Sequence, residues 1–384
     1  RYPKGIPIYP ERRLADLIGE ERIDAVYFSY SDVSHTHVMQ RAGTVLAAGA
    51  DFHLLSPRHT NIKVGRPVIA VTAVRTGSGK SQTARKIVRM LKEHGKQVVA
   101  VRHPMPYGDL TKQILQRFSS YQDLDAHNCT IEEREEYEPY LDLGLVVFAG
   151  IDYAQIARVV EQEAEVVVWD GGNNDVPFFF TDLHLTVLDP LRAGHERLYY
   201  PGEVNFLKAD VLVINKYRQA SPDQLGQLNR SISAHNPRAQ IIHGDSRIIV
   251  EDPAGIHGKR VLAIEDGPTV THGEMAFGAA FVAAQEHGAA TIVDPRPYAV
   301  GSIKKAFHDY PHLSAVLPAL GYYPEQLKEL EATINAVPCD LVLVASPIDI
   351  RRVITITKPS QRVRYELEEI GKPDLADLLA HFLR

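Results

Sequence analysis

Apolar runs of strand length recur along almost the whole chain and alternate with segments of helix length. The runs are rich in valine, isoleucine and leucine, and they cover residues 24–30, 67–74, 97–103, 145–150, 165–170, 183–189, 210–216, 240–245, 260–266, 290–295 and 340–346. Near-continuous runs of this kind are typical of strands that are buried on both faces of a parallel sheet. The pattern therefore predicts an α/β fold with a mainly parallel sheet, whose ligands bind beyond the carboxyl ends of the strands.

Two connections with turn-forming residues mark the best candidates for domain boundaries, at residues 61–67 and 251–259. From these boundaries we predict an N-terminal Rossmann-like unit of residues 1–66, a nucleotide-binding domain of residues 67–255 and a C-terminal α/β domain of residues 256–384.

A glycine-rich turn follows the apolar run 67–74 and leads directly into a helical segment. The turn ends in Gly79, Lys80 and Ser81, the last three positions of the phosphate-binding motif G-x-x-x-x-G-K-[ST], whereas Val74 stands where that motif has its first glycine. In such P-loops backbone N–H groups surround phosphate oxygens, the lysine reaches the β- and γ-phosphates, and the hydroxyl binds Mg²⁺. The strand–turn–helix context favours a nucleotide site over a plain turn, formed by Thr76, Gly77, Ser78, Gly79, Lys80, Ser81 and Gln82.

Arg75 lies five residues before Lys80. One superclass of dimer-forming P-loop proteins, which includes MinD, ArsA and dethiobiotin synthetase, often carries a second, signature lysine at this position. A guanidinium there can hold phosphate oxygens through two hydrogen bonds, so we predict a catalytic role for Arg75, with a solvated loop arginine as the alternative. By analogy we also expect a homodimer with the nucleotide near the subunit interface.

Asp170 ends the apolar run 165–170, where a Walker B carboxylate would hold Mg²⁺ through water. We therefore predict that Asp170 is a catalytic and metal-binding residue. The tail that follows it contains Asn173 and Asn174, which either position substrate or belong to an Asx-rich turn.

A second polar strand exit follows the run 97–103. Arg102 and His103 are available for phosphate groups, and Asp109 is available for the metal ion. The prolines of this segment would by themselves mark only a turn, so both interpretations stay open.

The order Asn215, Lys216, Tyr217, Arg218 resembles the N/T-K-x-D element that reads guanine, with arginine in place of the aspartate. That aspartate accepts hydrogen bonds from guanine N1 and N2. We therefore predict that Asn215 and Lys216 lie at the nucleotide and that ATP is preferred, with GTP as the alternative.

Two further segments carry many polar residues. We interpret the acidic run 130–139 as a solvated helix with Glu/Arg pairs rather than as a metal site. Beyond the run 260–266, Asp266 and His272 either face the site or cap a helix that begins near Gly273.

Composition argues against several classes of function. A net charge of −6 and a pI near 6.3 provide no basic field for nucleic acid, and no run of about 18 apolar residues is present to cross a bilayer. Cys129 and Cys339 show no metal-ligand spacing. We expect a cytoplasmic protein with reduced thiols and with neither a nucleic-acid nor a membrane partner.

Blocks spread over nearly the whole chain carry a family resemblance: "YSDVSH", "AVRTGSGKSQ", "RHPMPYGDL", "TIEEREEYEP", "WDGGNND", "PGEVNF", "EDGPTVTHGEM", "VDPRPYAVGS", "SPIDIRR" and "RVRYELEEIGKP". In these blocks the chain resembles the archaeal cyclic 2,3-diphosphoglycerate synthetases and related bacterial predicted GTPases. The family often has aspartate where this chain has Arg218, which puts guanine use in doubt. Its members carry an additional N-terminal strand and turn, so the resemblance implies that the unit of residues 1–66 is incomplete.

The resemblance implies ATP-driven closure of an intramolecular phosphoanhydride in 2,3-diphosphoglycerate. The γ-phosphoryl group would pass to a substrate phosphate, which the neighbouring phosphate would then attack with loss of phosphate. Cations that follow predicted strands can hold such an anion, although each by itself can be a surface charge; they are Arg102, His103, Arg192, His195, Arg296, Arg351 and Arg352. With them we predict substrate contacts from Asn173, Asn174, Asp266 and His272.

Two classes of function compete. The first is an ATP-dependent ligase that acts on a small anionic metabolite, which 2,3-diphosphoglycerate exemplifies. The second is a regulatory or chaperone-like GTPase that acts through a protein partner. The polar strand ends outside the P-loop domain favour the enzyme, and no Cys/His cluster offers a site for metal cargo.

Overall fold

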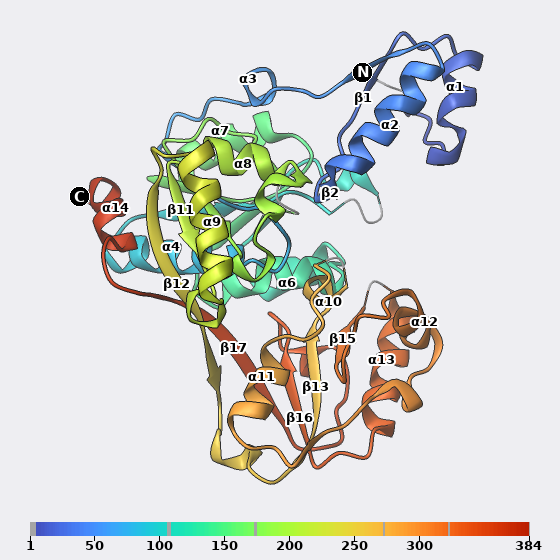
Figure 1. The fold of residues 1–384 in the computed structure, drawn as a ribbon, viewed down its shortest axis with the longest axis vertical. Helices are drawn as coiled ribbons and strands as arrows, with labels where there is room; N and C mark the ends of the chain where they lie inside the picture. The colour runs from blue at the N-terminus through green and yellow to red at the C-terminus, as the bar shows by residue number, and fades with distance from the viewer. Residues whose placement is uncertain (1–4, 106–108, 173–174, 272, 322, 384) are drawn as a thin grey trace.

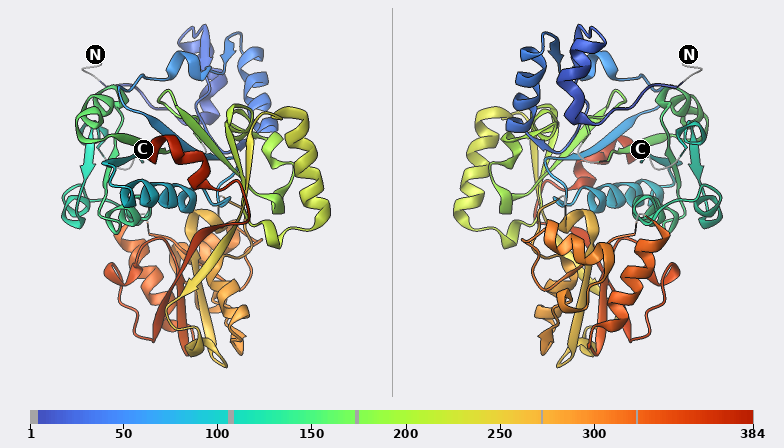
Figure 2. Two further views of the ribbon diagram at one scale, coloured as in Figure 1. Left: turned by 90° about the vertical axis from the view of Figure 1, so that its left-hand side faces the viewer. Right: turned by 90° about the vertical axis from the view of Figure 1, so that its right-hand side faces the viewer.

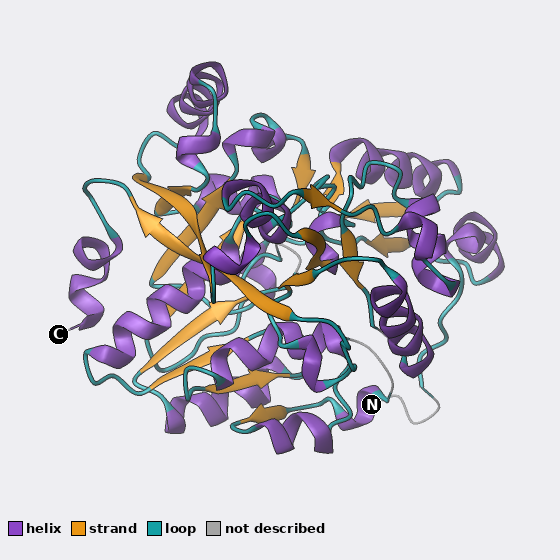
Figure 3. Cartoon of the chain, turned by 90° about the horizontal axis from the view of Figure 1, so that it is seen from below, coloured by secondary structure: helices purple, strands orange, loops and turns teal. Residues whose placement is uncertain are grey.

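The computed structural model describes residues 5–105, 109–172, 175–271, 273–321 and 323–383. Figure 1 shows three groups of elements along the long axis, with the N-terminal segment at one end, the P-loop domain in the middle and most of the C-terminal segment at the other end. Seen from below, in Figure 3, helices flank the strands. Within the described residues, no helix combines the length and the apolar character needed to cross a membrane.

The P-loop domain is built on a sheet with strand order β12-β11-β9-β4-β8-β5-β7-β6. All neighbouring pairs are parallel except β6 with β7. The strands are β4 (Val68–Ala73), β5 (Val98–Val101), β6 (Gln116–Phe118), β7 (Val146–Ala149), β8 (Val166–Asp170), β9 (Leu183–Leu188), β11 (Val211–Ile214) and β12 (Gln240–Val250). The central strands β4 and β8 are buried along their whole length, as their apolar runs predict.

Helices cover this sheet and complete its core. They are α4 (Lys80–Glu93), α5 (Tyr121–Ala126), α6 (Ile131–Leu141), α7 (Tyr153–Glu163), α8 (Gly202–Lys208) and α9 (Pro222–His235). In α4 the residues Ala84, Ile87, Val88 and Leu91 are fully buried against the sheet. Their spacing of three and four residues puts them on one helix face. The other faces of α4 can therefore carry polar side chains, and those near the start of the helix lie at the carboxyl ends of the strands.

The N-terminal segment forms a small unit of its own. It contains α1 (Leu14–Glu20), β1 (Ala25–Tyr27), β2 (Val33–Ser34), α2 (His35–Ala47), β3 (Asp51–His53) and α3 (Pro57–Thr60). Strands β1 and β3 are parallel, whereas β2 pairs in antiparallel fashion with β10 (Tyr199–Tyr200) of the P-loop domain. The β2–β10 pair attaches this unit to the P-loop domain.

The C-terminal segment contains a second, mainly parallel group of strands with the order β14-β13-β16-β17, and β15 also pairs with β13. Its strands are β13 (Arg260–Asp266), β14 (Thr291–Ile292), β15 (Leu317–Ala319), β16 (Leu341–Ala345) and β17 (Ser360–Glu369). Its helices are α10 (Gly267–Val270), α11 (Ala279–Glu286), α12 (Gly301–Asp309), α13 (Pro324–Ala336) and α14 (Leu375–Leu383).

Strand β17 joins the two groups of strands, and no apolar run in the sequence marks it. Residues 360–362 pair with β16 in parallel, and residues 363–369 pair with β12 in antiparallel fashion. Helix α14 then packs beside α4, where Leu375 and Leu379 are fully buried in the core of the P-loop domain (Figure 2). The boundaries near residues 66 and 255 stay predictions, and the structure adds that the chain returns to the P-loop domain after β16.

Candidate active site

The loop between β4 and α4 has the backbone of a phosphate-binding turn. Gly77 and Gly79 have positive φ angles of 80° and 110°, which side chains rarely tolerate. A Cβ atom on Gly79 would lie 2.2 Å from the Asn215 side-chain nitrogen. Val74 stands where the motif has its first glycine, and there the glycine is on the neighbouring segment instead. A Cβ atom on Gly202 would lie 2.3 Å from the carbonyl oxygen of Val74, so the two backbones approach closely.

Lys80 is the first residue of α4 and points toward the end of β8. Its Nζ donates to Oδ1 of Asp170 at 2.5 Å and to the carbonyl oxygen of Gly171 at 2.5 Å. Burial lowers the pKa of Lys80 to about 8, although the carboxylate of Asp170 acts in the opposite direction. The ammonium group is thus held where a nucleotide phosphate would meet it.

The pKa of Lys80 leads to the first prediction. A nucleotide phosphate attracts the protonated amine, so we expect the affinity of the free protein for ATP to fall as the pH rises through about 8. An ordinary lysine would keep its charge to about pH 10. The measurement is the ATP dissociation constant between pH 6.5 and 9.5, with Lys80→Arg as the control. Because arginine keeps its charge, its profile should lack this decline, and equal profiles for both proteins would contradict the assignment.

Asp170, at the carboxyl end of β8, is fully buried and held by several donors. Arg102 and the hydroxyl group of Tyr140 both contact its Oδ2, and Arg102 also forms an ion pair with Glu136 on α6. Burial raises the pKa of Asp170, but the charges of Arg102 and Lys80 and the hydrogen bonds outweigh burial and hold the pKa below its ordinary value. Asp170 is therefore a carboxylate. Arg102, which the sequence suggests for substrate, lies between two carboxylates in the structure.

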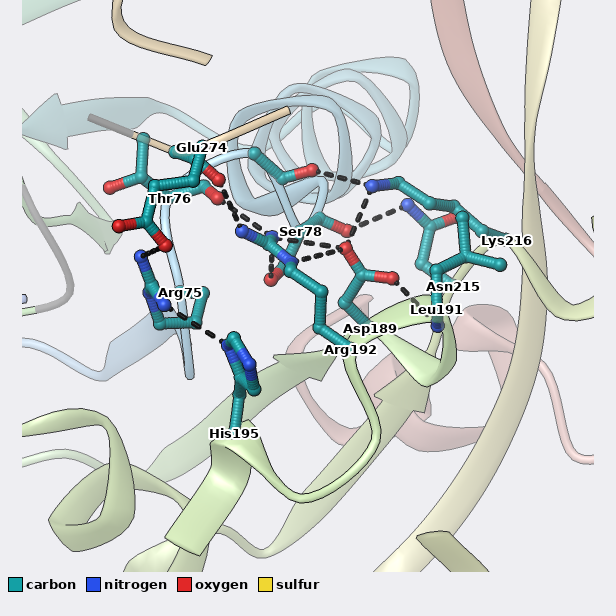
Figure 4. A network of polar contacts seen from close by, with 12 residues as sticks. Arg75, Thr76, Ser78, Asp189, Leu191, Arg192, His195, Asn215, Lys216 and Glu274 are labelled. Atoms are coloured by element: carbon teal, nitrogen blue, oxygen red, sulfur yellow. Dashed lines mark hydrogen bonds and ion pairs between the residues drawn. The ribbon is translucent and has the colours of Figure 1, made fainter. Parts of the chain in front are cut away.

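Residues expected at the nucleotide hold the outer side of the loop. Nδ2 of Asn215 donates to the carbonyl oxygen of Ser78 at 2.8 Å. Nζ of Lys216 donates to the carbonyl oxygen of Gly77 at 2.9 Å and to Oδ2 of Asp189 at 2.8 Å (Figure 4). These contacts stabilise the turn through its carbonyl groups, while the N–H groups of Thr76 and Ser78 donate to Asp32 and to the carbonyl oxygen of Arg75.

Arg192 connects the P-loop with the C-terminal segment. Its guanidinium donates to the carbonyl oxygens of Thr76 at 2.8 Å and of Gly273 at 2.7 Å, and it pairs with Asp189 at 3.0 Å (Figure 4). The structure therefore brings Arg192, predicted for substrate binding, next to the loop, where its donors contact protein groups.

Arg75 is buried and surrounded by groups of its own chain. It forms an ion pair with Asp32 at 2.8 Å, shares a hydrogen bond with Nδ1 of His195 at 3.0 Å, and reaches Glu274 at 3.5 Å (Figure 4). Its Cζ atom lies 3.6 Å from the centre of the Tyr199 ring, a cation–π contact. Burial and the charge of Arg75 lower the pKa of His195. The structure thus places Arg75 and His195 together beside the loop.

A cavity of ≈ 240 Å³ opens between the P-loop and the C-terminal segment. The P-loop side contributes Arg75, Lys80, Ser81, Gln82 and Arg85. The other walls carry apolar side chains, among them Met275, Phe277 and Val282, together with carboxyl groups. The acidic residues lie on α6 and at the end of β13; they are Glu132, Glu135, Glu136, Glu265 and Asp266. A binding site next to the nucleotide is therefore rich in carboxyl groups.

Other predicted residues lie away from this cavity. Asp109 is exposed and accepts hydrogen bonds from Thr111, and Arg296 forms an exposed ion pair with Asp294. His103 contacts Asp175 at 2.7 Å. The remaining pairs are Arg351 with Asp349 at 2.7 Å and Arg352 with Glu138 at 3.4 Å. Asn173, Asn174 and His272 lie outside the described residues.

The interpretation of the acidic run 130–139 as a solvated helix is wrong. In α6 the side chains of Glu133, Glu135 and Glu138 are 3%, 6% and 2% exposed. The helix lies between the P-loop domain and the C-terminal segment, which cover it from both sides (Figure 1). A signal was present in the one aromatic residue of the run, Tyr137, which is fully buried in the core.

Two acidic residues beside the P-loop were missed. Asp32, in the unit of residues 1–66, accepts hydrogen bonds from N and Oγ1 of Thr76 at 3.2 and 2.6 Å. Asp189, at the end of β9, anchors Lys216 and Arg192. The sequence offered a signal for both, because Asp189 ends an apolar run and Asp32 lies in the block "YSDVSH" that carries the family resemblance.

Comparison with known proteins gives a close relative in sequence and a likeness in fold to solved structures, while no family model matches the chain. Over 383 residues, 100% of this chain and 86% of the relative, the chain is 55% identical to a protein named arginine synthetase ArcE from Thermococcus kodakarensis. The structure of LpxK from Aquifex aeolicus was solved in complex with ATP. Its superposition covers 85% of this chain and 91% of the LpxK chain, with a TM-score of 0.51 and 12% sequence identity. This likeness shows the fold alone and confirms the predicted α/β P-loop architecture.

Proposed function

The chain belongs to the family of the arginine synthetase ArcE, and from this premise we propose that it is an ATP-dependent ligase that forms the guanidinium group of arginine. The observation that carries the choice of substrate is the acidic cavity beside the P-loop. Carboxyl groups suit an amino acid with an ammonium group and a product with a guanidinium group.

The proposed acceptor is the ureido group of citrulline, because it differs from a guanidinium group by one oxygen in place of one nitrogen. In the first step, the ureido oxygen attacks the γ-phosphorus of ATP. The bond between the γ-phosphorus and the bridging oxygen breaks, and ADP leaves with the electron pair. The product is a phosphorylated isourea whose phosphate can act as a leaving group.

In the second step, ammonia attacks the ureido carbon and forms the new C–N bond. The C–O bond to the phosphate breaks, inorganic phosphate leaves with its electrons, and the nitrogen loses a proton. Citrulline, ammonia and ATP thus yield arginine, ADP and phosphate. Reactions of this type need positioning and charge neutralisation more than covalent participation of the enzyme.

The P-loop residues have defined roles in this scheme. Lys80, at the start of α4, neutralises the β- and γ-phosphates as charge moves to the leaving ADP. Ser81 lines the cavity, and the buried carboxylate of Asp170 lies beside Lys80. A hydroxyl and a carboxylate are oxygen donors that fit Mg²⁺, which neutralises phosphate charge when it is bound. Gly77 and Gly79 shape the turn that receives the phosphates.

Closure of a phosphoanhydride in 2,3-diphosphoglycerate is the alternative substrate assignment. The guanidinium groups of Arg75 and Arg192 beside the P-loop favour an anionic acceptor. Against it, Arg102 is bound by Asp170 and Glu136, and five carboxyl groups line the cavity, where ionised carboxylates would repel a polyanion. The acidic lining therefore favours the amino acid.

We predict that citrulline and ammonia together stimulate ATP turnover by the protein and that arginine accumulates in equal amount with ADP. Phosphate release and amino acids are measured with ATP and Mg²⁺ alone, with citrulline, with ammonium and with both. A parallel reaction contains 2,3-diphosphoglycerate. Stimulation only by the diphosphate, with a cyclic product, would instead select the alternative, and stimulation only by a protein partner would select the regulatory GTPase.

The predicted homodimer and the preference for ATP over GTP remain part of this proposal. The contacts that Arg75 makes with Asp32, His195 and Glu274 lie within one chain. Arg218 is more than half exposed at its side chain and faces Asp245 and Glu368, so no guanine-reading carboxylate stands at that position.

A further inference from the structure

Two carboxyl groups in the cavity face each other across elements that are far apart in the sequence. Glu135 lies on α6 and Asp266 ends β13. Oε1 of Glu135 accepts from the hydroxyl of Ser346 at 2.7 Å, and Oδ2 of Asp266 accepts from the hydroxyl of Thr269. Asp266 also accepts a hydrogen bond from the backbone N–H of Thr269, and the charge of Arg85 acts on it. Within the described part of the chain, Oε2 of Glu135 has no hydrogen-bond donor and neither carboxyl group forms an ion pair. Glu135, only 6% exposed, thus presents an unpartnered oxygen in a cavity wall.

Burial and mutual repulsion act on this pair in the same direction. Burial, and then the charge of Asp266, raise the pKa of Glu135 well above its ordinary value, and burial raises that of Asp266. A neighbouring cation would relieve both effects. The nearby Glu265 differs, because its carboxyl oxygens accept from the backbone N–H groups of Ala280 and Phe281 at 3.2 and 2.8 Å. Glu265 therefore holds α11, whereas Glu135 and Asp266 keep capacity for a ligand.

Arg85 supplies the opposite charge on the other wall of the cavity. It lies on α4 four residues after Ser81, and both side chains line the cavity. Residues four apart lie on one helix face, about 6 Å apart along the axis. Within the described residues Arg85 forms no ion pair, and its Cζ atom lies 5.9 Å from the centre of the Tyr365 ring. Its guanidinium is thus available one helical turn beyond the phosphate end of the site.

We infer that Glu135, Asp266 and Arg85 form the site for the α-amino acid end of the substrate, with the carboxyl pair on the α-ammonium group and Arg85 on the α-carboxylate. This inference rests on the proposed function and assigns residues to it. An amino acid held there extends its side chain back along α4 toward Ser81 and Lys80. The reacting end of a citrulline-length side chain then reaches the γ-phosphate. The carboxyl pair also selects against polyanions, because two carboxylates repel anionic groups and favour a cationic one.

The test replaces each charge by a neutral side chain of similar shape and measures kinetics with citrulline, ammonium and ATP. We expect Glu135→Gln and Arg85→Gln each to raise KM for citrulline about 10- to 100-fold, the usual effect of losing a hydrogen bond to a charged group. KM for ATP should change little, which shows that the P-loop is intact. Glutamine at position 135 can still accept from Ser346, so the fold should be retained.

Matched controls come from the same helices. Glu138→Gln lies on α6, one turn from Glu135, where its carboxylate contacts Arg134 at 3.3 Å outside the cavity. Arg89→Gln lies on α4, one turn from Arg85, where it pairs with Glu366 at 3.0 Å. Both controls should keep the wild-type KM for citrulline.

A substrate analogue separates the two halves of the site. The decarboxylated analogue of citrulline lacks the group assigned to Arg85, so the Arg85→Gln substitution should not weaken its use further, whereas Glu135→Gln should. If the wild type uses citrulline but both variants behave as their controls, the residue assignment is overturned while the proposed function stands. Recovery of Glu135→Gln by added Mg²⁺ would also overturn it, because the pair would then be a metal site. If the wild type uses no citrulline, the proposed function itself fails.

Discussion

Lys80→Ala is expected to lower ATP turnover about 1,000-fold or more while the protein stays folded. Lys80 is the cation that contacts Asp170 and Gly171 at the mouth of the P-loop, and alanine removes it from the β- and γ-phosphates. Lys80 lies one turn before Ala84 at the start of α4, where its contacts are polar, and it does not belong to the apolar cluster that contains Ala84, Ile87 and Leu91. Alanine also favours helix, so the start of α4 should form as before.

Turnover is measured as ADP formation with saturating substrates, and folding by thermal unfolding. Lys92→Ala is the control, because Lys92 lies on the same helix and donates to the carbonyl oxygen of Leu143 at 2.5 Å, away from the cavity. It should retain wild-type turnover. A folded Lys80→Ala protein with turnover within a few-fold of the wild type would mean that the P-loop is not the catalytic centre.

Arg102→Met is expected to lower the free energy of unfolding by about 3–5 kcal/mol, the cost of removing one partner from a buried ion pair. Arg102 is 1% exposed and bridges Asp170 on β8 with Glu136 on α6. Methionine fills a similar volume but leaves both carboxyl groups without the guanidinium. The pKa of Asp170 should rise, because Arg102 is the largest of the groups that hold it down. Denaturant titration at pH 7 measures the loss.

Arg117→Met provides the comparison. Arg117 pairs with Glu163 at 2.9 Å, but the two side chains are 40% and 31% exposed, so solvent screens the interaction. Its loss should cost no more than about 1 kcal/mol. The sequence suggested Arg102 as a substrate ligand, and that role predicts another outcome: a stable Arg102→Met protein with weak substrate binding. The two measurements therefore distinguish a residue that supports Asp170 from one that contacts substrate.

The phosphate-binding loop and the presence of the central strands could be predicted because their signals are local. The apolar runs that became β4, β8 and β9 are contiguous, and a strand buried on both faces has no polar alternation to hide it. Gly77 and Gly79 are needed for backbone angles within the same turn. β17 could not be predicted in this way, because it pairs with two different strands along its length. Its first residues pair with β16 and the others with β12, so which side chains are buried depends on both neighbours.

The candidate substrate site could be predicted only in part, since charged side chains look alike in sequence whether they face water or a cavity. Asp266 was singled out because it ends an apolar run, and the structure places it in the cavity wall. Glu135 lies in a helix whose charges read as solvated, and Arg85 lies among other basic residues of α4. Only the tertiary packing brings α4, α6 and β13 around one cavity, so that these residues line it together.

The sequence by itself therefore determined the α/β P-loop fold and the backbone turn at which we predict the nucleotide phosphates to bind, because both depend on residues that are neighbours in the chain. The tertiary structure decided what surrounds the acceptor. Burial raises the free energy of an unpaired carboxylate. Unpaired carboxyl groups in a cavity wall therefore indicate that a cationic group of a ligand binds there. Whether a glutamate is buried depends on segments more than 100 residues away, as the contact of Glu135 with Ser346 shows at a separation of 211 residues.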